Sequence, residues 1–144
     1  MPYPVEMERR IPIATANSAS PLHIVQVGAD FVEQVLFQRT FRAAEPNVNL
    51  RQFAASLPAL AYVTAYTDTI DLFMIDLGLA GNVSGLELTC RIRDLGCTGH
   101  IILSSTYGSP ERALLNRLRA EFLPKPQHIL DVASTLSKYR GTAP

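Results

Sequence analysis

Residues 71–88 read DLFMIDLGLAGNVSGLEL, and this stretch decides the fold. It opens with an almost entirely apolar run at 71–75, which is typical of a central strand buried on both faces. Ser84 and Glu87 then form an S-x-x-E capping box, which indicates the start of a helix. A buried strand, a short loop and a capped helix make one β–α unit of a parallel sheet.

The same alternation of apolar runs and helical patterns continues on both sides of this stretch. Five strands are predicted, at residues 23–27, 47–53, 71–75, 100–103 and 121–124. Five helices are predicted between and after them, at residues 31–44, 57–66, 85–95, from 109 onward, and 127–138. Five β–α units in succession predict an α/β fold with a doubly wound parallel sheet.

Length and composition predict one domain. At 144 residues, 47% hydrophobic and 18% charged, the chain can bury one sizeable core. Residues 21–140 are predicted to form this domain. Residues 1–20 are predicted to be an N-terminal arm or flexible tail, and residues 141–144 a C-terminal tail.

Charge and hydropathy argue against several classes of protein. Thirteen basic residues balance thirteen acidic ones, so no nucleic-acid partner is expected. No apolar stretch approaches the roughly 20 residues that span a bilayer, and residues 1–20 lack the apolar segment of a secretory signal. Cys90 and Cys97 are too few for a disulfide scaffold, so two reduced thiols in a cytoplasmic protein are expected.

Polar side chains end or follow three of the predicted strands. Asp76 ends the third, Ser104 and Ser105 end the fourth, and Lys125 follows the fifth. Ligands of such sheets bind beyond the carboxyl ends of the strands, so these groups are expected to converge. A carboxylate can attack phosphorus while an ammonium and a hydroxyl neutralise the phosphoryl oxygens. A partly buried Asp–Lys pair without a catalytic task would use the same residues.

The motifs DLFMIDLGLAGNVSGLEL, IILSS and EFLPKP resemble the receiver domains of two-component response regulators. The resemblance covers roughly residues 22–138 and includes Gly85, which matches the family's glycine after the third-strand loop. It implies a CheY-like, flavodoxin-like receiver fold, (βα)5, with a parallel sheet of strand order 2-1-3-4-5.

The resemblance also implies roles for single residues. Asp76 falls on the phosphoacceptor, Lys125 on the lysine that accompanies it, and Ser104 on the switch hydroxyl. Phe122 falls on the aromatic switch, although a plain packing role is an equal alternative, and Pro126 falls on a cis proline.

The first strand departs from the family pattern. Where two acidic residues normally hold Mg²⁺, this chain has Gly28 and Ala29. The remaining candidate ligands are Asp76, the backbone carbonyl of Gly78 and Asp30. Because Mg²⁺ prefers near-octahedral oxygen ligation that includes one or two carboxylates, it is expected to bind weakly or not at all.

The loss of the acidic pair also changes the expected charge balance. Glu33 is predicted to be an exposed helix residue and therefore a poorer candidate ligand. With less negative charge nearby, Lys125 is free to pair with Asp76 and to hold it ionised but occupied.

Two functions follow from these residues. The first is a single-domain response regulator, not an enzyme, that accepts a phosphoryl group on Asp76 from a histidine kinase or a histidine phosphotransfer protein. Ser104 and Phe122 would respond, and an unknown downstream protein would read the change, with a homodimer possible. The alternative is a pseudo-receiver, a docking module that works without phosphorylation. A flavodoxin-like enzyme or nucleotide binder is disfavoured, because no glycine-rich loop follows the first strand.

Overall fold

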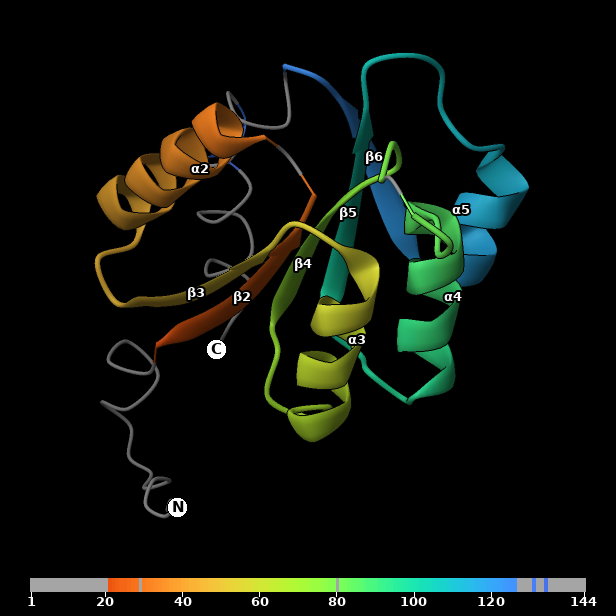
Figure 1. The fold of residues 1–144 in the computed structure, drawn as a ribbon, viewed down its shortest axis with the longest axis horizontal. Coiled ribbons are helices and arrows are strands. Elements are labelled where there is room, and N and C mark those ends of the chain that lie inside the picture. The colour runs from red at the N-terminus through yellow and green to blue at the C-terminus, as the bar shows by residue number, and fades with distance from the viewer. Residues whose placement is uncertain (1–20, 29, 80, 127–130, 132–133, 135–144) are drawn as a thin grey trace.

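A computed structural model describes residues 21–28, 30–79, 81–126, 131 and 134. Its centre is a five-stranded parallel sheet (Figure 1). The spatial order β3-β2-β4-β5-β6 is 2-1-3-4-5 when the strands are counted along the chain, which confirms the predicted α/β receiver topology. The strands are β2 (Leu22–Val27), β3 (Val48–Phe53), β4 (Leu72–Asp76), β5 (His100–Ser105) and β6 (Ala120–Pro124).

Helices cover both faces of the sheet. They are α2 (Phe31–Ala44), α3 (Ser56–Ala65), α4 (Gly85–Asp94) and α5 (Arg112–Leu118). In Figure 1, α2 lies on one side of the sheet, and α3, α4 and α5 lie on the other. The predicted arm at 1–20 falls outside the described residues, as does the predicted helix at 127–138 apart from residues 131 and 134. None of the helices within the described part of the chain has the length and hydropathy to cross a bilayer.

Strand β4 is buried on both faces, as its apolar run predicts. Leu72 and Met74 belong to the cluster that α2 covers, whereas Phe73 and Ile75 belong to the larger cluster beneath α3 and α4. Successive side chains of a strand point to opposite faces, so each of these four residues fills a core. The strand therefore holds Asp76, its last residue, in a fixed place at the carboxyl end of the sheet.

Helix α4 begins where the capping signal predicts. The Ser84 hydroxyl accepts a hydrogen bond from the Glu87 backbone N–H at 3.1 Å. A Cβ on Gly85 would lie 2.5 Å from the Asp76 carbonyl oxygen, so glycine lets the helix start directly against the strand end. Leu95, the last residue of the helix predicted at 85–95, is exposed, because the helix ends at Asp94 and Leu95 is its C-cap.

Two predicted boundaries need correction. Strand β5 extends through Ser105, two residues beyond the predicted end. Helix α5 begins at Arg112, not at Ser109-Pro110, because residues 106–111 form an irregular loop ahead of it. Together these corrections place the loop between β5 and α5 at residues 106–111.

Candidate functional site

The sheet register brings Asp76 and Ser104 side by side. Asp76 at the end of β4 pairs with Ser104 in β5. Partner residues of neighbouring parallel strands point to the same face, so the carboxylate and the hydroxyl share the face that α2 covers. Ser104 is buried, and together with Asp76, Glu33 and Lys125 it lines a small cavity of about 10 Å³.

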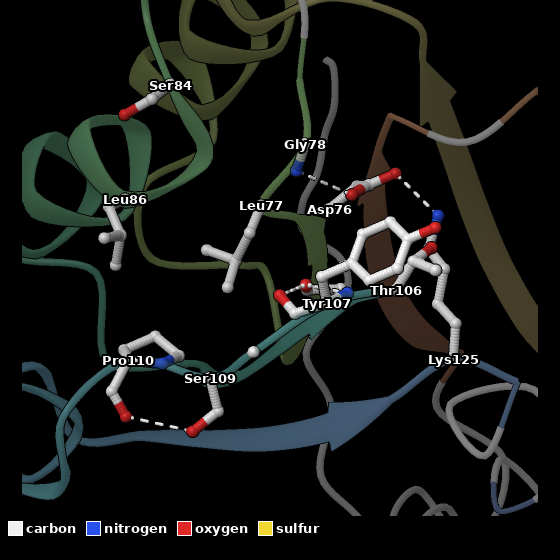
Figure 2. A pocket seen from close by; sticks show the side chains of 12 residues that line it. Asp76, Leu77, Gly78, Ser84, Leu86, Thr106, Tyr107, Ser109, Pro110 and Lys125 are labelled. Atoms are coloured by element: carbon white, nitrogen blue, oxygen red, sulfur yellow. Dashed lines mark hydrogen bonds and ion pairs between the residues drawn. The ribbon is translucent and has the colours of Figure 1, made fainter.

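Asp76 uses both of its carboxylate oxygens. Oδ1 accepts a hydrogen bond from the Gly78 backbone N–H at 2.8 Å, and Oδ2 accepts one from Lys125 Nζ at 2.8 Å (Figure 2). The side chains of Asp76 and Lys125 are only 16% and 18% exposed. The predicted convergence of these strand-end groups is therefore present in the structure.

Lys125 has a second carboxylate partner, Glu33, that no sequence pattern indicates. Its Nζ lies 3.2 Å from Oε1 of Glu33, which is presented by the first turn of α2. The expectation that Glu33 is an exposed helix residue is wrong, since its side chain is 22% exposed. Burial alone would lower the pKa of Lys125, but hydrogen bonds and charge from Asp76 and then Glu33 outweigh it and raise that pKa.

A pocket of about 690 Å³ opens beside Asp76 (Figure 2). Its walls come from the segment after β4, the start of α4 and the loop after β5, and Lys125 closes one side. Hydroxyl groups are frequent on these walls, from Ser84, Ser105, Thr106, Tyr107 and Ser109. Of these residues, the sequence predicts Ser105 as a strand end and Ser84 as a helix cap. For Thr106, Tyr107 and Ser109, the available signal was the polar run that follows the apolar strand β5.

Two loop features complete the site. The Ser105 hydroxyl accepts the Tyr107 backbone N–H at 3.0 Å, which folds the start of the β5–α5 loop back on itself. The Lys125–Pro126 peptide bond is cis, as the resemblance implies.

Phe122 pairs with Leu103 and packs against the larger core, so it lies on the opposite face of the sheet from Ser104.

The residues around Asp76 do not fit the Mg²⁺ site of the family pattern. Gly28 has φ +96°, and a Cβ built on it would lie 2.6 Å from the Asp76 Cβ. A carboxylate side chain has no room at this position. Ala29 lies outside the described residues.

The other candidate ligands are engaged elsewhere. The Asp30 carboxylate caps α2 by accepting the Glu33 backbone N–H at 2.8 Å. For Gly78, the contact seen is through its N–H and not through its carbonyl. Among the described residues, no three His, Cys, Asp or Glu side chains gather in a metal-binding arrangement. Ligation by Asp30 and by the Gly78 carbonyl stays a prediction that this geometry does not favour.

Comparisons with known proteins agree with the topology. No protein-family model and no curated protein matches the chain. A response regulator receiver domain protein (CheY-like) from Methanospirillum hungatei JF-1 superposes with a TM-score of 0.71 at 18% identity, covering 85% of this chain and 95% of that one. The chain has the receiver-domain fold.

Two further receiver structures are similar. The chemotaxis protein CheY4 of Vibrio cholerae matches with a TM-score of 0.68 at 18% identity, covering 83% of this chain and 99% of that one. CheY in a CheX-CheY-BeF3-Mg complex from Borrelia burgdorferi matches with a TM-score of 0.67 at 16% identity, covering 82% and 88%. At such identities the likeness establishes the receiver fold, while the chemistry depends on the residues of this chain.

Proposed function

We propose that this chain is a single-domain response regulator receiver that accepts a phosphoryl group on Asp76 and signals through contact with another protein. The observation that carries the proposal is the 2.8 Å contact between Lys125 Nζ and Asp76 Oδ2 at the edge of an open pocket. The receiver fold explains why β4 and the segment after β6 deliver these two groups to one place.

The proposed step is phosphoryl transfer from a histidine of a kinase or phosphotransfer protein. A carboxylate oxygen of Asp76 attacks phosphorus, a P–O bond forms, and the P–N bond to the donor imidazole breaks. The product is an acyl phosphate on Asp76, and the donor's imidazole keeps the electron pair of the broken bond, takes up a proton from water and is left unphosphorylated. Lys125 offsets negative charge on the phosphoryl oxygens, and the Ser104 hydroxyl, which lines the same small cavity as Asp76 and Lys125, donates to one of them.

We further propose that this step does not depend on a tightly held Mg²⁺. The support is the position of Gly28 against Asp76 and the use of the Asp30 carboxylate as a helix cap. The ammonium of Lys125 is the positive charge that the chain itself supplies. Among the described residues that line the two cavities at Asp76, it is the one basic side chain.

The proposed output is contact with a downstream protein. The CheX-CheY-BeF3-Mg complex from Borrelia burgdorferi is an example of a receiver in contact with another protein. The surface beside the site is formed by the β5–α5 loop, where Tyr107 is highly exposed. We propose that phosphorylation changes how this loop and Ser104 are arranged, and that the partner reads that change.

A second candidate function has specific support. Both carboxylate oxygens of Asp76 are already bonded, and the backbone of Gly28 covers one side of the residue. These features favour a pseudo-receiver that docks to its partner without phosphorylation, with Lys125 and Asp76 as a structural ion pair.

Intact-mass measurement separates the two candidates. The protein is incubated with a small phosphodonor such as acetyl phosphate, with and without Mg²⁺. The proposal predicts the gain of one phosphoryl group in the wild type, its loss in Asp76→Asn, and its retention in Asp94→Asn. Asp94 is a matched control, since it is exposed at the far end of α4. No gain in mass under any condition would leave the docking module as the function.

A further inference from the structure

We propose that Glu33 is a positioning residue for Lys125: its carboxylate shares the ammonium with Asp76 and so couples the first turn of α2 to the charge on Asp76. The proposal concerns the same site as the proposed function. It gives Glu33 a role, whereas the resemblance to receiver domains implies no role for any residue of α2.

The first step of the argument is the direction in which Glu33 points. Its neighbours Phe31 and Val32 are apolar yet 76% and 64% exposed, whereas the charged Glu33 side chain is turned toward the sheet. This reverses the usual pattern of an amphipathic helix, in which charged side chains face water. A carboxylate leaves water at low cost only when it is paired, and here its partner is Lys125.

The second step is that the helix backbone holds Glu33 in place. Asp30 is the N-cap of α2, and its carboxylate accepts the Glu33 N–H at 2.8 Å. The cap fixes the first turn of α2, and from there Glu33 Oε1 reaches Lys125 Nζ at 3.2 Å. Asp30 therefore acts indirectly, by fixing the residue that holds the lysine.

The third step is charge balance. One ammonium lies between two carboxylates, at 2.8 Å from Asp76 and 3.2 Å from Glu33. A change of charge on either carboxylate must move the ammonium toward the more negative partner, because the attraction between unlike charges rises as their distance falls. Added negative charge on Asp76 draws the Lys125 ammonium away from Glu33. When Asp76 is neutral, the ammonium keeps Glu33 as its one charged partner of the two.

Lysine side-chain NMR tests the proposal directly. The chain has two lysines, Lys125 and Lys138, so a lysine-labelled sample gives two ammonium signals. Lys125→Gln assigns them by removing one. The exchange rate of the Lys125 ammonium protons with water reports how firmly the carboxylates hold them, and the Lys138 signal serves as an internal reference.

Glu33→Gln is expected to speed the exchange of the Lys125 ammonium protons several-fold, because one charged acceptor is lost. The control is Glu87→Gln. Glu87 also lies in the first turn of a helix, with its N–H accepted by an N-cap side chain, but it pairs with Arg91 on the surface. This control is expected to leave Lys125 unchanged. An unchanged Lys125 signal in Glu33→Gln would overturn the proposal.

A second pair of variants tests the proposal without relying on Glu33→Gln alone. In Asp76→Asn, Lys125 is expected to keep intermediate protection, since Glu33 still holds it, and the amide signals of the first turn of α2 are expected to shift. In Asp76→Asn with Glu33→Gln, the residual protection should vanish. If Asp76→Asn alone abolishes all protection, Glu33 does not position Lys125. No phosphodonor is used, so the result is independent of whether Asp76 is phosphorylated.

Discussion

Gly28 lies against Asp76 with a backbone conformation that few other residues adopt. Its φ of +96° disfavours a side chain, and a Cβ would approach both the Asp76 Cβ at 2.6 Å and Leu79 Cδ2 at 2.7 Å. The acidic residue of the family pattern therefore cannot simply be put back. The absence of a carboxylate here is part of how the strand end packs.

We expect Gly28→Ala to lower the free energy of unfolding by about 2 kcal/mol or more, from backbone strain and overpacking together. Gly81→Ala is the matched control, because Gly81 also has a positive φ, +106°, but nothing within 4 Å of its Cβ position. Urea denaturation of both variants measures the difference. Equal losses in the two variants would show that contact with Asp76 adds nothing. Gly28→Asp is expected to lose at least as much stability as Gly28→Ala and to gain no Mg²⁺ site.

His23 is a second residue with a defined effect, at the other end of the sheet. It is buried, its Nε2 lies 2.6 Å from the Tyr62 hydroxyl, and its Nδ1 lies 3.3 Å from the Thr69 hydroxyl. Burial lowers its pKa, and the nearby charge of Asp71 opposes this only in part. The folded protein therefore binds a proton at His23 less readily than the unfolded chain does.

This difference predicts a pH dependence of stability. The unfolded state binds more protons below about pH 6.5, so stability is fully present above that value and falls as the pH decreases toward the lowered pKa of His23. The slope from one such group is at most about 1.4 kcal/mol per pH unit. Denaturation at several pH values should show a shallower slope in His23→Gln. An identical slope in the variant would contradict the assignment.

Among the secondary structure elements, α4 and α5 are joined by one side chain. The Arg93 guanidinium donates to four backbone carbonyls, those of Leu118, Cys97, Gly99 and Arg119, at 2.7 to 3.0 Å. The carbonyls of Leu118 and Arg119 lie at the C-terminal end of α5, where helix carbonyls lack partners within the helix, and those of Cys97 and Gly99 lie in the loop after α4. The planar guanidinium of Arg93 therefore joins the end of α5 to that loop.

We expect Arg93→Lys to lower the free energy of unfolding by about 2 kcal/mol, because an ammonium cannot reach four carbonyls in this fork geometry. Arg91→Lys, which changes an exposed pair with Glu87, should cost less than about 0.5 kcal/mol. Thermal or urea unfolding compares the two. A loss in Arg93→Lys no larger than in Arg91→Lys would show that the four contacts add little to stability.

The elements also show how far the sequence could be read. The buried strand ending at Asp76 and the cap at Ser84 were predictable, since each depends on a local pattern. The position of Glu33 was not, because the apolar Phe31 and Val32 beside it suggest the opposite orientation for this turn of α2. Helix α5 begins later than its sequence predicts, since Ser109-Pro110 resembles a helix start but lies in the loop.

At the scale of the whole molecule, the strand order of the sheet brings the residues of the site together. Strand order 2-1-3-4-5 places the ends of β4, β5 and β6 next to one another, so residues about 50 positions apart in sequence meet without any local signal. The convergence of Asp76, Ser104 and Lys125 could be predicted once five β–α units were recognised. The contact of Glu33 with Lys125 depends on the placement of α2, and the close approach of Gly28 to Asp76 depends on the backbone angles of Gly28. No sequence pattern specifies either of these.

A double-mutant cycle on Asp76 and Lys125 tests the central claim most directly. The free energy of unfolding is measured for the wild type, Asp76→Asn, Lys125→Gln and the double variant. Because the two side chains are largely buried and 2.8 Å apart, we predict a coupling energy of about 1 kcal/mol or more. Strictly additive losses, with a coupling near zero, would contradict the site as described.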